Sequence, residues 1–218
     1  MRTYFEANER FCLICNETLD TLQNVDLFSS CLCRKCRSQF RMCKKIYKID
    51  QLEWHVLYEY DEFLERVLFR YKEQCDRMLA PVFLEPVQHH LHTMKKYTVC
   101  GLCSSDKKRL QRGFDPLFDI FDSYGISIYF PLYKNKEHKQ SQLSRKEREK
   151  VKDVIFRKEQ YRLLNKPILL VDDVCTTGAS LQRAITLLAP QKVFVIAAHP
   201  LWLSKHKEMI VEKKSLFW

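Results

Sequence analysis

Apolar runs in this chain alternate with segments whose apolar residues recur every three or four positions. Short apolar runs predict buried strands, and the three-to-four spacing predicts amphipathic helices. From Asp61 onward, for example, the apolar side chains between Phe63 and Tyr71 follow helical spacing, and Asp61 suits a helix start. We expect strands at residues 55–60, 97–102, 126–133, 167–173 and 192–198, and helices from residue 61, at about 78–93 with early interruption by Pro81 and Pro86, around 115–124 and at 179–188.

The predicted strands carry few alternating polar positions. Strands of this kind are typical of a parallel sheet that helices cover on both faces. The sequence therefore predicts an α/β domain with a mostly parallel sheet over residues 51–218. Ligands in such sheets bind at the carboxyl ends of strands, where we expect Asp172 and Asp173 to lie.

The composition agrees with an α/β domain and indicates where in the cell the protein acts. A chain of 218 residues suits one medium domain with a small appendage, and 46% hydrophobic with 29% charged residues is typical of a soluble globular protein. No uninterrupted run of about 18 apolar residues occurs, so we expect a cytoplasmic protein without membrane insertion. The formal net charge of +10 favours phosphorylated small molecules, nucleic acid or anionic lipid as partners without choosing among them.

The first fifty residues contain two CxxC pairs, Cys12 with Cys15 and Cys33 with Cys36, separated by 17 residues. Each pair can form a tight turn that aims two thiolates at one point, and four thiolates complete the tetrahedral shell of structural Zn²⁺. Cys31 is an alternative to Cys33, which we prefer because it completes a CxxC pair. We therefore expect a four-cysteine zinc-binding domain at residues 1–50.

Basic residues surround these cysteines, and Phe40 and Tyr47 lie among them. Basic side chains can contact phosphates and aromatic rings can stack on bases, so this segment could hold single-stranded DNA. The alternative is a solvated basic face. The basic residues are Arg34, Lys35, Arg37, Arg41, Lys44, Lys45 and Lys48.

Two other polar segments have both an ordinary and a functional interpretation. His89, His90 and His92 could form a metal cluster, but we prefer exposed helical histidines. Residues 134–152 are dense in charge, which favours a mobile loop with a short solvated helix. The functional alternative is a cover that closes over an anionic ligand.

The stretch ILLVDDVCTTGAS at residues 168–180 joins a predicted buried strand to a predicted helix. Backbone N–H groups and hydroxyls at a helix N-terminus form an anion site, and Gly178 allows close approach of the backbone. Asp172 and Asp173 can accept hydrogen bonds from vicinal hydroxyls, directly or through hydrated Mg²⁺. Ribose 5-phosphate carries both features, so we favour a ribose-phosphate pocket over an ordinary strand exit.

This stretch resembles the phosphoribosyl diphosphate (PRPP) motif of type I phosphoribosyltransferases, and with the double CxxC the chain resembles the ComF family of competence proteins. Residues 109–115 are similar to the family's RxxRGFN segment. Residues 140–156 are similar to a second segment of the family, in which a QxxL motif (Gln140 to Leu143) is followed by an arginine (Arg148) and a phenylalanine (Phe156). The resemblance implies a type I phosphoribosyltransferase-like fold that binds PRPP, with Mg²⁺, or ribose 5-phosphate. The implied catalytic pair is Asp172 and Asp173, which would hold the ribose hydroxyls, while Thr176, Thr177, Gly178, Ala179 and Ser180 would hold the 5-phosphate, and Arg112, Gly113 and Arg148 would line the remaining pocket.

The chain departs from the family pattern around the diphosphate. Residues 99–103 read VCGLC instead of a VPVP-like turn, Asp115 replaces an asparagine, and Val151 replaces another. We therefore expect ligand binding to be retained more firmly than phosphoribosyl transfer.

Three functions follow from these expectations. The resemblance implies a competence protein that helps single-stranded DNA enter the cytosol in natural transformation, beside a helicase-like ATPase partner, ComFA. The alternative is an active phosphoribosyltransferase of nucleotide salvage, for which the sequence identifies no base-recognition pocket. The third possible function is that of a structural adaptor that binds no ligand. The presence of Asp172, Asp173 and the hydroxyl residues of segment 176–180 weighs against it.

Overall fold

The computed structural model describes residues 10–19, 31–104, 106–135, 154–159 and 163–211. Within these ranges no helix is long and apolar enough to cross a membrane. The strands are Met42–Ile49 (β1), Leu52–Glu59 (β2), Thr98–Gly101 (β3), Ile128–Tyr129 (β4), Leu132–Asn135 (β5), Val154–Arg157 (β6), Ile168–Cys175 (β7), Lys192–Ala198 (β8) and Ile210–Val211 (β9). The α-helices are Arg34–Ser38 (α1), Glu62–Glu73 (α2), Asp106–Arg112 (α3), Pro116–Asp122 (α4), Ala179–Leu188 (α6) and Pro200–Lys205 (α7), and the 3₁₀ helices are Arg77–Phe83 (η1), Glu85–Lys96 (η2) and Lys207–Met209 (η3).

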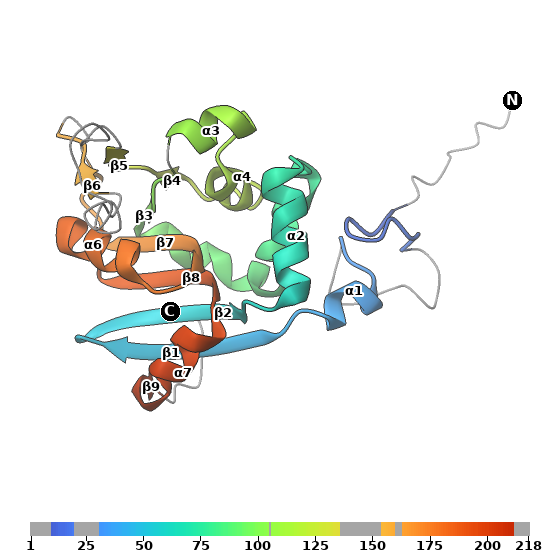
Figure 1. Ribbon diagram of the computed structural model, residues 1–218, viewed down its shortest axis with the longest axis horizontal. Coiled ribbons are helices and arrows are strands. Elements are labelled where there is room, and N and C mark those ends of the chain that lie inside the picture. Colours follow the sequence, from blue (N-terminus) through green and yellow to red (C-terminus); the bar gives the residue numbers. More distant parts are fainter. Residues whose placement is uncertain (1–9, 20–30, 105, 136–153, 160–162, 212–218) are drawn as a thin grey trace, which may run out of the picture.

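Among the described residues, seven strands form one sheet in the order β4-β3-β7-β8-β2-β1-β9, from top to bottom in Figure 1. The five strands from β4 to β2 pair in parallel, and β1 and β9 continue the sheet in antiparallel pairing. β5 and β6 form a separate antiparallel pair. The predicted fold class, a mostly parallel α/β sheet, is confirmed.

Alternate residues of the central strands enter two different cores. In β7, Leu169 and Val171 face the core covered by α2, α4, η1 and η2, whereas Leu170 faces the core covered by α6 and α7. All three side chains are fully buried. Helices therefore cover both faces of the sheet, which explains why its strands are almost uniformly apolar.

The β1–β2 hairpin corrects the expected organisation near residue 50. Its two-residue turn, Asp50 and Gln51, has positive φ at both positions (49° and 65°), as a type I′ turn requires. Ile49 pairs with Leu52 across the turn. The predicted boundary between residues 50 and 51 thus falls inside a hairpin of the main sheet.

Prolines divide two predicted elements. The strand expected at residues 126–133 is split into β4 and β5 at Pro131, which has no N–H to donate to a sheet. The helix expected at about 78–93 consists of η1, which contains Pro81, and η2, which has Pro86 in its first turn. The strands β2, β3, β7 and β8 and the helices α2, α4 and α6 lie where the hydrophobic pattern predicts them, within a few residues.

Candidate functional site

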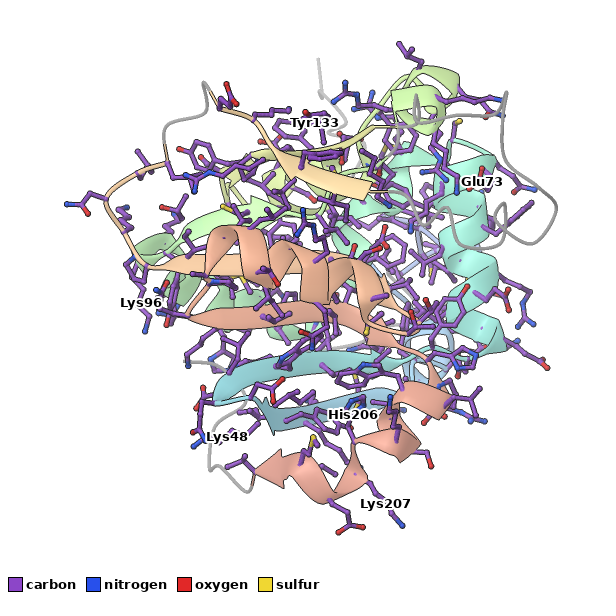
Figure 2. The ribbon with its side chains drawn as sticks, turned by 60° about the vertical axis from the view of Figure 1, so that its left-hand side comes forward. Lys48, Glu73, Lys96, Tyr133, His206 and Lys207 are labelled. Atoms are coloured by element: carbon purple, nitrogen blue, oxygen red, sulfur yellow. The ribbon has the colours of Figure 1, made fainter. Side chains whose placement is uncertain are left out.

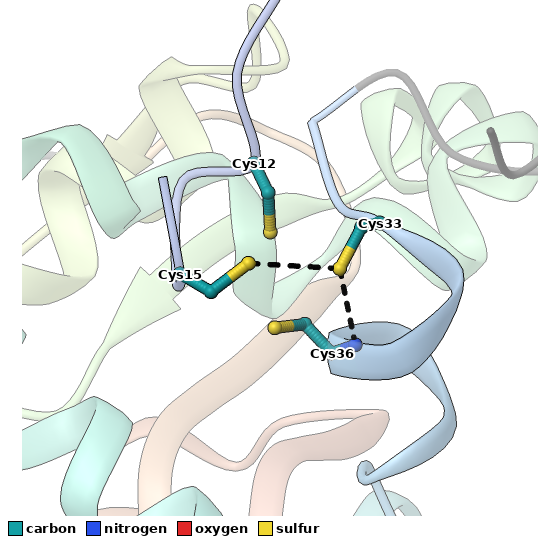
Figure 3. Close-up of side chains that lie close together, drawn as sticks. All are labelled: Cys12, Cys15, Cys33 and Cys36. Atoms are coloured by element: carbon teal, nitrogen blue, oxygen red, sulfur yellow. Dashed lines mark hydrogen bonds between the residues drawn. The ribbon is translucent and has the colours of Figure 1, made fainter. Parts of the chain in front are cut away.

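Four cysteine side chains converge on one point at the N-terminal end of the described chain (Figure 3). Cys12 and Cys15 lie on one turn, and Cys33 and Cys36 lie at the start of α1. Their four Sγ atoms are all within 4.8 Å of one another, and Cys15 Sγ is 3.7 Å from Cys33 Sγ. The N–H of Cys36 donates a hydrogen bond to Cys33 Sγ at 3.4 Å.

These distances suit a structural zinc ion. Four thiolates held tetrahedrally at about 2.3 Å from Zn²⁺ lie about 3.8 Å from one another. Cys12, Cys33 and Cys36 are buried, so a metal bound here has little contact with water. Burial alone would raise the pKa of Cys12, but backbone N–H groups outweigh burial and lower it to about 7, which favours the thiolate that zinc binds. Burial raises the pKa of Cys15 and of Cys36, so these two thiols would lose their protons to a bound metal. The four cysteines could therefore hold Zn²⁺ that supports folding.

Cys31, the alternative to Cys33, lies outside this cluster. Its Sγ is 3.7 Å from Glu85 Oε1, a buried carboxylate at the start of η2. The structure thus brings together the four cysteines that the two CxxC pairs predict. No histidine joins a metal-binding group in the part of the chain that the structure describes, so His89, His90 and His92 form no such cluster.

The cysteine module, defined as residues 10–19 and 31–41, packs against α2. Arg70 Nη1 donates a hydrogen bond to the carbonyl oxygen of Ile14 at 2.7 Å, and Arg70 Nη2 pairs with Asp76 at 2.8 Å. The ring of Phe40 lies 5.0 Å from that of Phe63 and is buried. In Figure 1, α2 stands between the sheet and α1.

Burial of Phe40 and Tyr47 corrects one expectation about this basic segment. Tyr47 is 1% exposed and packs on Trp202, and Phe40 is 7% exposed, so neither ring can stack on a nucleic-acid base. Arg34, Lys35, Lys44, Lys45 and Lys48 are exposed, so contact with phosphates stays a prediction.

A cavity of about 420 Å³ opens at the carboxyl end of β7. Its walls come from α2, from the segment after β3, from α3 and from the β7–α6 loop. The charged residues among them are four cations and two carboxylates, which favours an anionic ligand. The lining residues are Lys72, Leu102, Cys103, Ser104, Lys108, Arg112, Leu117, Lys134, Asp172, Asp173, Val174, Cys175, Thr176, Thr177, Gly178, Ala179, Ser180 and Leu181.

The two carboxylates in this cavity are not equivalent. Asp172 Oδ1 accepts a hydrogen bond from the N–H of Asp173 at 2.9 Å, whereas Asp173 Oδ2 forms an ion pair with Lys72 Nζ. Burial, and then the neighbouring Asp173, raise the pKa of Asp172 to about 8. Burial would also raise the pKa of Asp173, but Lys72 and the N–H of Val174 hold it below its usual value. Asp172 is the carboxyl that can carry a proton, and Asp173 stays ionised.

The hydroxyl loop, residues 176–180, leads into the N-terminus of α6. Gly178 caps this helix with φ +80°, a conformation that glycine adopts without steric cost. Thr177 Oγ1 accepts a hydrogen bond from the N–H of Ala179 at 3.4 Å. The N–H groups of Thr176 and Gly178 donate to no residue that the structure describes, so they remain available to an anion.

Arg112, at the end of α3, also lines the cavity and pairs with Glu73, which Figure 2 labels at the end of α2. Its side chain is only 9% exposed, and its Nε is buried without a hydrogen-bond partner among the described residues. Arg148, the second predicted arginine, and the expected cover at residues 134–152 beyond Asn135 lie outside the described residues. Asp115 is the N-cap of α4, where its carboxylate accepts from the N–H of Phe118.

Lys72 is the charged cavity residue next to the carboxylate pair that sequence reasoning missed; Lys108 on α3 was missed as well. It lies on α2, four positions after the buried Leu68, so it borders the apolar stripe of the helix. This position is the one signal that its side chain could reach the interior. Its partner, Asp173, is 101 positions later in the chain, beyond the range of any local pattern.

The fold and site together define an α/β protein with a mostly parallel sheet and a charged cavity at the carboxyl end of β7, preceded by a small four-cysteine module. No protein-family model matches the chain. The chain is 27% identical over 207 residues to the competence protein ComFC of Streptococcus pneumoniae, with 81% of this chain and 92% of the relative covered. A crystal structure of orotate phosphoribosyltransferase from Aeropyrum pernix shares 14% identity at a TM-score of 0.28, covering 78% of this chain and 94% of its own. The comparison thus agrees with the resemblance to the ComF family of competence proteins, through a relative of that name and through the four-cysteine module.

Proposed function

We propose that this chain acts in natural transformation, in the uptake of single-stranded DNA on the cytoplasmic side, and that its cavity binds PRPP or ribose 5-phosphate. The observation that carries the ligand is one cavity lined both by the carboxylate pair and by the hydroxyl loop. Carboxylates accept hydrogen bonds from sugar hydroxyls, and a helix N-terminus with free N–H groups binds phosphate. A pentose 5-phosphate presents both groups in one small molecule.

The charges around the cavity support this choice of ligand. Lys108 and Lys134 line it together with Arg112, whose buried Nε has no acceptor among the described residues. A ligand phosphate would supply acceptors to these donors. With PRPP, Mg²⁺ would accompany the diphosphate, and Asp172 and Asp173 are the residues that would face it.

Transfer of the phosphoribosyl group, as in a salvage enzyme, is the alternative function. Among the described residues, no aromatic side chain lines the cavity on which an acceptor base could stack. The lack of such a ring favours binding of the sugar phosphate over its transfer to a base.

The role in DNA uptake rests on the family. The relative is a competence protein by name. The exposed basic residues of the cysteine module, with Zn²⁺ holding its fold, offer a surface for single-stranded DNA or for a partner such as the ATPase ComFA. In this proposal the cysteine module is the part of the chain that binds single-stranded DNA or the partner protein.

Deletion of the gene and complementation test the proposal. Uptake of labelled DNA should fall on deletion and return with the wild-type gene. A gene carrying Asp172→Asn and Asp173→Asn should restore the protein level but not full transformation. Normal transformation in the deletion strain would remove the competence role. Thermal shift of the purified protein with ribose 5-phosphate and with Mg-PRPP tests the ligand separately, because an unchanged melting temperature with both would mean that neither binds.

A further inference from the structure

The ammonium group of Lys72 lies next to the carboxylate pair, Asp172 and Asp173, whose negative charge a cation would compensate. Its Nζ contacts Asp173 Oδ2, and its side chain is 16% exposed against 21% for Asp173. Asp172 has a different partner: its Oδ1 accepts a hydrogen bond from the backbone N–H of Asp173. Each aspartate therefore has a second oxygen, Asp172 Oδ2 and Asp173 Oδ1, that neither of these bonds uses.

The position of Lys72 is fixed by its neighbours on α2. Tyr71 is completely buried, and its hydroxyl donates a hydrogen bond to the carbonyl oxygen of Pro116 at 2.8 Å. Arg70 is held on the other side by Ile14 and Asp76. The helix cannot turn about its axis without breaking these contacts, so the ammonium group is preorganised beside Asp173.

On the basis of the proposed function, we propose that Lys72 replaces a divalent cation at the carboxylate pair, so that the ligand is a metal-free pentose 5-phosphate rather than the magnesium complex of PRPP. Lys72 would then be the residue that determines which phosphoribosyl compound the cavity accepts.

Charge and coordination geometry both support this assignment. The Lys72 ammonium compensates the charge of Asp173, so the carboxylate pair has less negative charge left to attract a divalent ion. Mg²⁺ prefers octahedral coordination by oxygen at about 2.1 Å and would have to displace the ammonium group. Ribose hydroxyls need no such displacement, because they can donate to the second oxygen of each aspartate.

Calorimetric titration of the purified full-length chain with ribose 5-phosphate, in EDTA and in Mg²⁺, tests the inference. Wild type should bind with the same affinity, within about twofold, in both buffers. Lys72→Met should bind about tenfold or more weakly in EDTA, because a charge-assisted interaction is lost, and should recover in Mg²⁺. Lys72→Arg should behave as wild type, which separates loss of the charge from damage to α2.

Lys108→Met is the matched control, because it removes one positive charge from the same cavity without touching the ion pair with Asp173. It should weaken binding equally in the two buffers. Wild-type binding that requires Mg²⁺, or a Lys72→Met variant whose affinity is equal to wild type in EDTA, would overturn the role of Lys72 while leaving the ligand in place. No binding by wild type in either buffer would instead overturn the proposed ligand and this inference with it.

Discussion

Gly178 lies against Trp202 beneath the hydroxyl loop. A Cβ atom on Gly178 would be 3.1 Å from Trp202 Nε1, and the residue has φ +80°. Trp202 is itself buried, with its ring 5.5 Å from that of Trp54. The hydroxyl loop thus packs on an aromatic layer, and both the positive φ and the close contact with Trp202 favour glycine at this position.

Gly178→Ala should therefore lower both stability and ligand affinity. Left-handed backbone at a residue other than glycine costs about 1–3 kcal/mol, and the contact with Trp202 adds to that cost. Urea unfolding measures the free energy of unfolding, and titration with ribose 5-phosphate measures the affinity. Gly125→Ala is the control: Gly125 has φ +63° but open space around its Cβ position. A Gly178→Ala variant no less stable than Gly125→Ala would contradict the role of Trp202.

The β7–α6 loop and the four cysteines could be predicted because their signals are local. In each case the residues that act together lie within a few positions of one another, or repeat a short spacing. Lys72 could not be predicted in the same way, because its pairing with Asp173 depends on how α2 packs on the sheet. Tertiary contacts of this kind have no signature in a local pattern.

β1 was missed for a different reason. It carries exposed Lys44 and Lys45, with an irregular register before Lys45 and φ of 46° at Lys44, so no clear alternation appears. Its turn, Asp50 and Gln51, lacks the glycine that marks most two-residue hairpins. The same basic surroundings made Tyr47 resemble a nucleic-acid contact, although it belongs to the core beside Trp202.

Cys33→Ser should abolish stoichiometric zinc, whereas Cys31→Ser should retain it. Cys33 belongs to the four-sulfur cluster, and Cys31 faces Glu85 instead. Zinc content of the two purified variants, measured by atomic absorption, checks this. Equal zinc in both variants would contradict the choice of ligands. Thermal unfolding of Cys33→Ser should also begin at a lower temperature, since metal binding contributes to the folding of this segment.

Arg70→Met should loosen the cysteine module from α2. The variant loses hydrogen bonds to Ile14 and Asp76 that involve a charged donor, at a cost of about 1.5–3 kcal/mol in the free energy of unfolding. Removal of zinc by a chelator, followed with a colorimetric indicator, should be faster than in wild type. Arg66→Met, an exposed change on the same helix, should leave both measurements within error. Equal rates for the two variants would show that the Arg70 contacts do not hold the module.

Asp172→Asn should change the pH dependence of stability. The pKa of Asp172 is raised to about 8 in the folded chain, above its value in the unfolded chain, so the folded state binds more protons between these values. The contribution of Asp172 to stability therefore falls as pH rises from about 4 to about 8. The variant cannot ionise, so its stability relative to wild type should increase over this range, as urea unfolding at several pH values will show.

Asp173→Asn should change the pH dependence of stability in the opposite direction, so that its stability relative to wild type falls as pH rises. Its folded pKa is lowered by Lys72, so its contribution is present above the unfolded pKa and is lost as pH falls. The variant leaves Lys72 without its partner and should lose on the order of 1–3 kcal/mol near neutral pH, since the pair is only partly exposed. Identical pH profiles for the two variants would contradict the conclusion that the pKa is raised at Asp172 and lowered at Asp173.

Replacement of Arg34 and Lys35 by glutamine should weaken binding of single-stranded DNA to the zinc-loaded chain. Both residues are exposed on α1, and each phosphate contact that is lost should reduce the slope of log affinity against log salt by about 0.7. The matched control replaces Lys95 and Lys96, which are exposed at the end of η2; Figure 2 labels Lys96. This control removes the same charge away from the cysteine module, so it should leave the slope unchanged. Fluorescence anisotropy with a labelled oligonucleotide over a salt series measures both slopes, and equal slopes would mean that the net charge of the chain, rather than the module, attracts the strand.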